Sequence, residues 1–74
     1  MATIETALGN DILPEHQQLA ETAIILAGYD LRTELTYPIL AKIENSLRET
    51  NAPAACVKNV TARLQQTLAY AQSL

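Results

Sequence analysis

Aromatic residues, glycine, cysteine and histidine are all scarce in this 74-residue chain, and each scarcity excludes a class of site. Phe and Trp are absent. Gly occurs only twice, so a Gly-rich phosphate-binding loop of the P-loop or dinucleotide type is excluded. A single cysteine, Cys56, excludes an internal disulfide framework. A single histidine, His16, argues against a zinc site built from protein ligands alone. We therefore expect no metal and no other cofactor.

Basic residues are also few, and the formal net charge is −3. The five basic residues are scattered along the chain, so they form no stripe that could track a nucleic acid backbone. The same dispersion disfavours an anionic membrane surface. These residues are Arg32, Lys42, Arg48, Lys58 and Arg63.

Long apolar runs are missing as well. The longest, Ala23–Ala27, is far shorter than the roughly 20 residues that span a bilayer. No basic region precedes an apolar stretch near the N-terminus, so no secretory signal is visible. We expect a soluble cytoplasmic protein with a reduced cysteine.

What the chain does contain is aliphatic: hydrophobic residues make up 49% of it, mostly Ala, Leu and Ile. Ala and Leu favour helices, and a chain of this length allows one small domain. The sequence therefore predicts an all-α fold over residues 1–74. We expect a small helical bundle of three main helices plus short helical segments.

A ladder of large aliphatic residues at every fourth position crosses the middle of the chain, with Pro38 inside it. On a straight helix its ends would lie about 160° apart, because each step of four overshoots one turn by about 40°. Proline in a helix interior costs about 3 kcal/mol. We therefore predict a break or kink near Pro38, with a short helix over 31–36 and a longer one over 37–50 that Thr36 caps. The ladder residues are Leu31, Leu35, Ile39, Ile43 and Leu47.

Two helices are predicted in the first 30 residues: a single turn over 3–8 and a longer helix over 12–27. Each follows a polar residue suited to an N-cap and ends before a glycine. The capping pairs are Thr3 with Gly9 and Asp11 with Gly28. On the longer helix the apolar residues gather on one side, while Ile25 falls among the polar residues of the other side. The apolar side comprises Leu19, Ala20, Ala23, Leu26 and Ala27.

The last helix is predicted over 52–73, with Asn51 as its N-cap and Pro53 in its first turn. Apolar and small residues alternate at spacings of three and four, which is a short heptad seam. The seam runs through Val57, Val60, Leu64, Thr67, Ala71 and Leu74. Its opposite face carries alanines, so little of this helix is clearly polar. Such a helix suits packing on more than one side.

Cys56 is the most reactive side chain available, because a position near a helix start can favour a thiolate. The alternative is a small buried apolar residue. His16 is expected at the core boundary with one hydrogen bond. The tyrosines Tyr29 and Tyr37 fall at helix boundaries, where they can be half-buried residues or interface anchors.

A non-enzymatic interaction module follows from this combination of apolar helical surface and missing catalytic motifs. We expect it to act as an adaptor, regulator or assembly subunit and to form a homo-oligomer, with a dimer favoured. The candidate interface residues are Ile25, Tyr29, Tyr37, Val57, Val60, Leu64, Leu68 and Ala71. Two alternatives remain open: a thiol-dependent or ligand-carrying protein that uses Cys56, and a helix-turn-helix protein, which the acidic balance disfavours.

Overall fold

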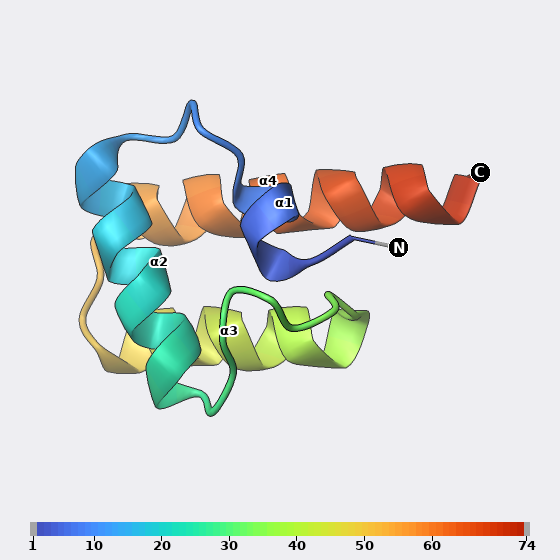
Figure 1. Ribbon diagram of the computed structural model, residues 1–74. Coiled ribbons are helices and arrows are strands. Elements are labelled where there is room, and N and C mark those ends of the chain that lie inside the picture. The colour runs from blue at the N-terminus through green and yellow to red at the C-terminus, as the bar shows by residue number, and fades with distance from the viewer. Residues whose placement is uncertain (1, 74) are drawn as a thin grey trace.

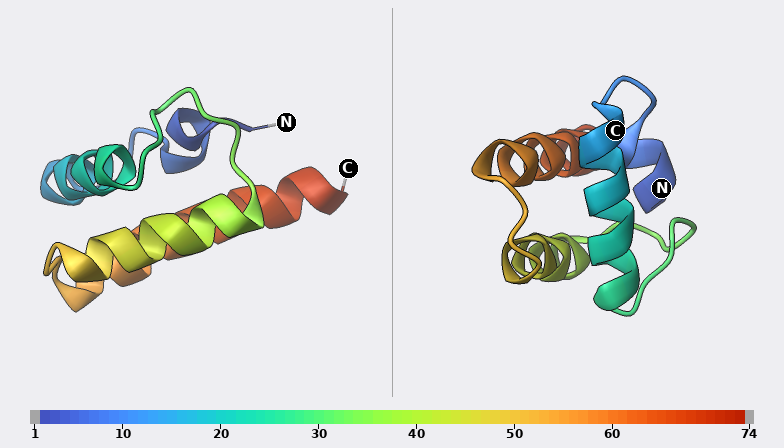
Figure 2. Two further views of the ribbon diagram at one scale, coloured as in Figure 1. Left: turned by 90° about the horizontal axis from the view of Figure 1, so that it is seen from below. Right: turned by 90° about the vertical axis from the view of Figure 1, so that its left-hand side faces the viewer.

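An antiparallel pair of helices forms one layer of the protein in the computed structural model, which describes residues 2–73. Helix α3 (Tyr37–Glu49) and helix α4 (Ala54–Ser73) lie side by side and run in opposite directions, as Figure 1 shows. The second layer holds helix α1 (Ile4–Leu8), helix α2 (Pro14–Leu26) and the connection over 27–36. Helix α2 crosses over both α3 and α4 (Figure 2). The all-α prediction is therefore confirmed.

The core fills the space between the two layers. Its fully buried large side chains include Ile4 from α1, Ile24 from α2 and Leu47 from α3, and Leu64 from α4 joins them. A hydrogen bond also joins the two layers. The Ser46 hydroxyl of α3 donates to the backbone carbonyl of Ala23 in α2, at 2.8 Å. This bond satisfies a buried hydroxyl and fixes the crossing of α2 over α3.

Pro38 begins a helix instead of kinking one. The side-chain oxygen of Thr36 accepts from the amide of Ile39, so Thr36 is the N-cap of α3 as predicted. Pro38 lies in the first turn, where its missing N–H leaves no helical bond unmade. The predicted break at this point is confirmed.

The predicted short helix over 31–36 is wrong, because this segment is a strap that bonds to α1. Amides at the start of α1 donate to it: Ile4 to the carbonyl of Thr33 at 3.0 Å, and Glu5 to that of Leu31 at 2.9 Å. The amide of Leu35 in turn donates to the carbonyl of Ala2 at 2.8 Å. These bonds satisfy orphan donors of α1 that a six-residue helix over 31–36 could not have reached.

Helix α1 itself agrees with the prediction for 3–8. The Thr3 hydroxyl accepts from the amide of Thr6 at 3.2 Å, which makes Thr3 the N-cap. Gly9 ends the helix with a positive φ of 69°, a conformation that glycine adopts without strain.

The start of α2 differs from the prediction, and Asp11 is not its N-cap. The helix begins at Pro14, and Leu13 before it is extended, with ψ 138°. A residue before proline is biased away from the helical region, which favours a helix start at Pro14 over one at Ile12. Asp11 instead forms an ion pair with Arg63 of α4. Gly28 ends α2 with a φ of 92°, as predicted.

The start of α4 differs for the same reason, because Pro53 disfavours a helical Ala52. Asn51 is therefore not the N-cap of α4. It ends α3 in the left-handed region, with a φ of 61°. The amides of Asn51 and Ala52 donate to the carbonyls of Arg48 and Leu47, which is the pattern of a Schellman motif.

The apolar side of α2 is rotated from the predicted one. Ala20 and Ala23 are fully buried as expected, but Ile24 is also buried, and Leu26 is 65% exposed. Helix α2 lies across two helices at once, so its buried strip is centred between Ala20 and Ala23 rather than on Leu26. Ile25 is 68% exposed, in agreement with its position among polar residues.

Candidate functional site

Cys56 and His16 lie close together between α2 and α4. The thiol of Cys56 donates a weak hydrogen bond, 3.9 Å long, to the backbone carbonyl of His16. The side-chain Nδ2 of Asn59 lies 3.3 Å from Nδ1 of His16, within hydrogen-bond distance. His16 is 9% exposed and lies at the edge of the core, as expected. These contacts link the start of α2 to the start of α4.

Cys56 is closed to reagents and to substrates. Its side chain is fully buried, and desolvation raises the pKa of the thiol above its ordinary value. The thiol is therefore protonated at neutral pH, and a protonated thiol is a poor nucleophile. Among residues 2–73, no three His, Cys, Asp or Glu side chains come close enough together to hold a metal ion.

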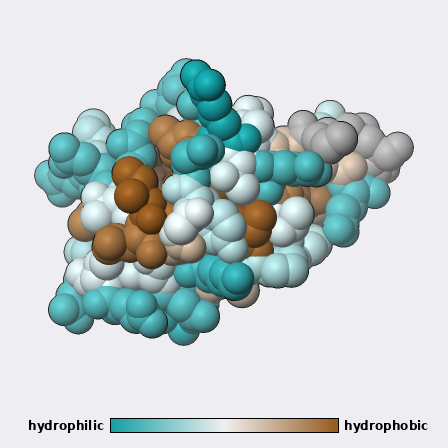
Figure 3. Space-filling model, turned by 60° about the horizontal axis from the view of Figure 1, so that its bottom comes forward, coloured by the Kyte–Doolittle hydropathy of each residue, from teal (hydrophilic) through white to brown (hydrophobic). Residues whose placement is uncertain are grey.

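The remaining candidates lie on the surface, where five large hydrophobic side chains are uncovered. Figure 3 shows apolar side chains gathered in the middle of one face, with polar side chains around them. Single exposed leucines are ordinary in proteins, whereas clusters of them mark interaction surfaces. The exposed side chains are Leu13 (58%), Ile25 (68%), Leu26 (65%), Tyr37 (47%) and Tyr70 (68%).

The predicted interface residues divide into two groups. Val60, Leu64 and Leu68 belong to the core of the chain itself, where α1, α2 and α3 cover the seam of α4. These residues do lie on the apolar side of α4, but the helices that cover that side belong to the same chain and not to a second copy. The other members keep some exposure: Ile25 and Tyr37 are exposed, and Tyr29, Val57 and Ala71 are half-buried. Leu74 lies outside the described residues.

Two adjacent residues at the end of α2 direct apolar surface into different hollows. Ile25 lines a hollow of about 510 Å³ together with α1 and the strap. Leu26 lines another, of about 550 Å³, together with α3. Residues 100° apart on a helix face different ways, which explains how neighbours serve two surfaces.

The Leu26 hollow carries balanced charge. Lys42 and Glu49 lie on its α3 side, two turns apart, with Asn45 between them. The ammonium of Lys42 lies 6.0 Å from the centre of the Tyr29 ring, which holds this lysine near the end of α2. No ion pair joins Glu49 to another side chain within residues 2–73.

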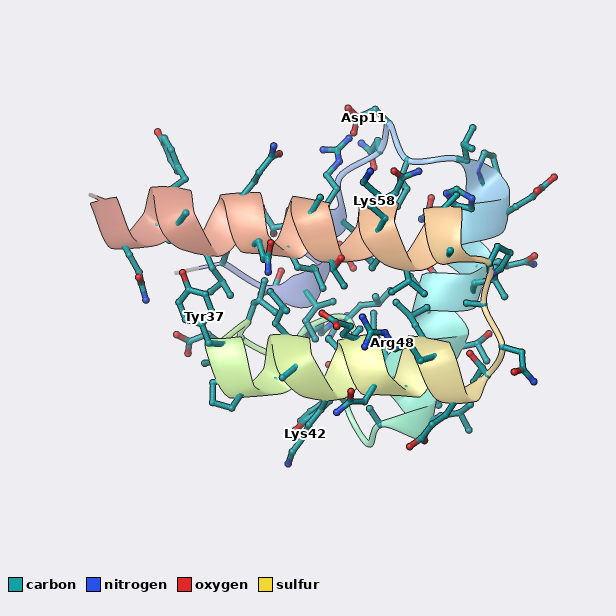
Figure 4. The ribbon with its side chains drawn as sticks, turned by 180° about the vertical axis from the view of Figure 1, so that it is seen from behind. Asp11, Tyr37, Lys42, Arg48 and Lys58 are labelled. Atoms are coloured by element: carbon teal, nitrogen blue, oxygen red, sulfur yellow. The ribbon has the colours of Figure 1, made fainter. Side chains whose placement is uncertain are left out.

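A third hollow, of about 690 Å³, lies on the outer side of the α3–α4 pair. Arg48 and Lys58 line it, and Figure 4 shows Arg48 directed from α3 towards α4. Arg48 already pairs with Glu44 one turn before it, at 2.8 Å. The half-buried Val57 is the one large aliphatic side chain of this lining.

No family model, curated protein or solved structure matches this chain. Within residues 2–73, no helix combines the length and hydropathy that crossing a bilayer requires.

Sequence reasoning missed Leu26, Lys42 and Glu49 as surface features. The helical projection placed Leu26 inside, because it grouped apolar residues without knowing which neighbours α2 would cross. The charge pair could have been found, since a seven-residue spacing puts Lys42 and Glu49 on the same face of α3.

Proposed function

We propose that this protein is a small non-enzymatic interaction module that acts in the cytoplasm as a homodimer. The observation that carries the proposal is the exposed Leu26, at 65%, beside a hollow with balanced charge. Fully burying a leucine side chain contributes about 1.5–3 kcal/mol, and a symmetric contact buries the leucine of both copies.

A symmetric dimer needs a surface that is complementary to itself, and the Leu26 hollow meets this condition. If two copies of α3 pack antiparallel about an axis near Asn45, each Lys42 faces Glu49 of the second copy. The dimer then contains two equivalent ion pairs between Lys42 and Glu49 at the edge of the contact. The two Leu26 side chains lie near the centre of the contact. Electrostatic pairs at a rim fix the register of such a contact.

The register can be tested by exchanging the two charges. Either Lys42→Glu or Glu49→Lys alone places like charges opposite each other in the dimer, and we expect each to weaken association about tenfold. The double exchange restores opposite charges and should recover association. The measurement is the dimer dissociation constant from sedimentation equilibrium.

Lys58→Glu serves as the matched control, because Lys58 is an exposed lysine of α4 on the outer side of the helix pair. It makes the same change in net charge as Lys42→Glu and should leave the dissociation constant unchanged. A double exchange that dissociates as readily as the single variants would contradict the proposed register.

A further inference from the structure

The hollow beside Ile25 is an apolar groove whose walls are already in place. Its floor is formed by Ile24, Ile25 and Leu31, and its volume is about 510 Å³. Ile25 is 68% exposed, so its side chain is available to a partner, whereas Ile24 is fully buried.

The edge of this groove is acidic. Glu5 from α1, Glu21 from α2 and Asp30, just before the strap, surround it, with Arg32 as the one basic residue. Three acids and one base leave a formal charge of −2 at the groove, out of −3 for the whole chain. No ion pair joins Glu5 or Glu21 to another side chain within residues 2–73.

Backbone hydrogen bonds hold the wall of the groove that the strap forms. The amide of Glu5 donates to the carbonyl of Leu31 at 2.9 Å, which ties the strap to α1. The carboxylate of Asp30 accepts from the amide of Arg32 at 2.8 Å and from the hydroxyl of Thr33 at 3.3 Å. A groove that is ordered before binding loses little conformational freedom when a ligand enters.

The charge of the groove argues against a second copy of this chain as its occupant. Arg48 and Arg63 are already paired with acids of the same chain, and Arg32 belongs to the groove itself. The remaining bases, Lys42 and Lys58, lie on different helices (Figure 4). Within residues 2–73, Arg48 and Lys58 do share a hollow, but the one large aliphatic side chain beside them, Val57, is half-buried. That hollow therefore offers no exposed aliphatic side chain that could enter the groove of a second copy.

From these observations we infer that the Ile25 groove binds a basic, amphipathic segment of a different protein. Such a segment would place one large aliphatic side chain on Ile25 and Leu31, and lysine or arginine side chains beside Glu5 and Glu21. This surface does not include the Leu26 hollow, so its binding does not depend on the dimer.

The test uses a 14-residue helical peptide with lysines on one face and leucines on the other, labelled with a fluorophore for anisotropy titrations. We expect saturable binding that weakens as salt is added, because the acidic edge is exposed. A second peptide with glutamate in place of every lysine, and the same leucines, should not bind. Absence of saturable binding by the lysine peptide, or equal binding of both peptides, would overturn the inference.

Matched variants locate the site. Glu5→Gln combined with Glu21→Gln should raise the dissociation constant at least about fivefold, and Ile25→Ser should raise it by a similar factor. The controls are Glu15→Gln, an exposed acid on α2 outside the groove, and Leu13→Ser, an exposed leucine outside it. Equal losses in the groove variants and the controls would show nonspecific attraction and overturn the site.

Sedimentation of the same variants separates this inference from the dimer. The groove variants should retain the wild-type dimer constant, and the Lys42 and Glu49 variants should retain peptide binding. If Glu5→Gln with Glu21→Gln, or Ile25→Ser, abolished both activities, the two surfaces would be one and the inference of a separate site would be wrong.

Discussion

Cys56 shows at the residue scale how burial decides what a side chain can do. Its place near the start of α4 suggests a reactive thiolate when only the sequence is considered. The structure places it fully inside the core, with its thiol on a backbone carbonyl of α2. Desolvation raises the pKa of the thiol, which is the reverse of what a nucleophile needs. Both observations favour the interpretation of Cys56 as a small apolar residue.

This raised pKa predicts a loss of stability at alkaline pH. Because the folded thiol holds its proton more tightly than the unfolded thiol, its contribution to stability is complete below the ordinary thiol pKa of 9.0. It declines as the pH rises from there through the raised pKa. We expect urea unfolding to show a steeper alkaline loss of unfolding free energy in the wild type than in Cys56→Ala.

The difference between the two proteins isolates the thiol, because every other side chain is the same in both. Parallel pH profiles for the two proteins would contradict the burial of Cys56. Rapid labelling of the native wild type by a thiol reagent at neutral pH would contradict it as well.

Prolines set the boundaries of the helices, and they mark both the success and the failure of sequence reasoning at this scale. Thr36 and Pro38 together predicted the start of α3, and the structure agrees. At Pro14 and Pro53 the predicted starts were too early, because the residue before a proline is biased away from the helical region. This bias alone does not place a helix start, since Tyr37 precedes Pro38 and is the first residue of α3.

The strap could not be predicted by local rules. Leu31 and Leu35 have helical spacing, but their backbone groups bond far along the chain: the carbonyl of Leu31 to Glu5 of α1, and the amide of Leu35 to Ala2 before it. Asp30 and Thr33 also bond local backbone amides with their side chains, which competes with helix formation. The walls of the Ile25 groove depend on these contacts, so the groove could not be predicted from the sequence.

Asn51 carries the sharpest prediction at the scale of elements. Its φ of 61° is strained for most residues, tolerated by asparagine and free for glycine. We expect Asn51→Ala to lower the free energy of unfolding by about 1 kcal/mol and Asn51→Gly to change it by less than about 0.5 kcal/mol. The measurement is chemical denaturation of the two variants beside the wild type.

Ala54→Gly, just inside the first turn of α4, controls for the flexibility that glycine adds to the unfolded chain. If Asn51→Ala were as stable as the wild type, Asn51 would not end α3 in the left-handed region. If Asn51→Gly lost more stability than Asn51→Ala, the same conclusion would follow.

At the scale of the whole molecule, the chain divides its apolar surface between two uses. The apolar side of α4 is buried in the core at Val60, Leu64 and Leu68, whereas Ile25 and Leu26 at the end of α2 are exposed. The general preference for a helical bundle was predictable from composition and spacing. Which faces remain uncovered was not, because it depends on how α2 crosses the other helices. The two proposed surfaces follow from that crossing, with Ile25 facing acids and Leu26 facing a balanced pair of charges.

The most direct test of this account is the molar mass of the protein in solution, measured by light scattering over a wide range of concentration. We predict the mass of two chains at high concentration, falling towards one chain on dilution. Leu26→Ser should shift this transition to at least about tenfold higher concentration, since it removes an apolar side chain from both copies. Leu13→Ser, an equally conservative loss of an exposed leucine outside the hollow, should leave the transition in place. A mass of one chain at every concentration would contradict the central claim.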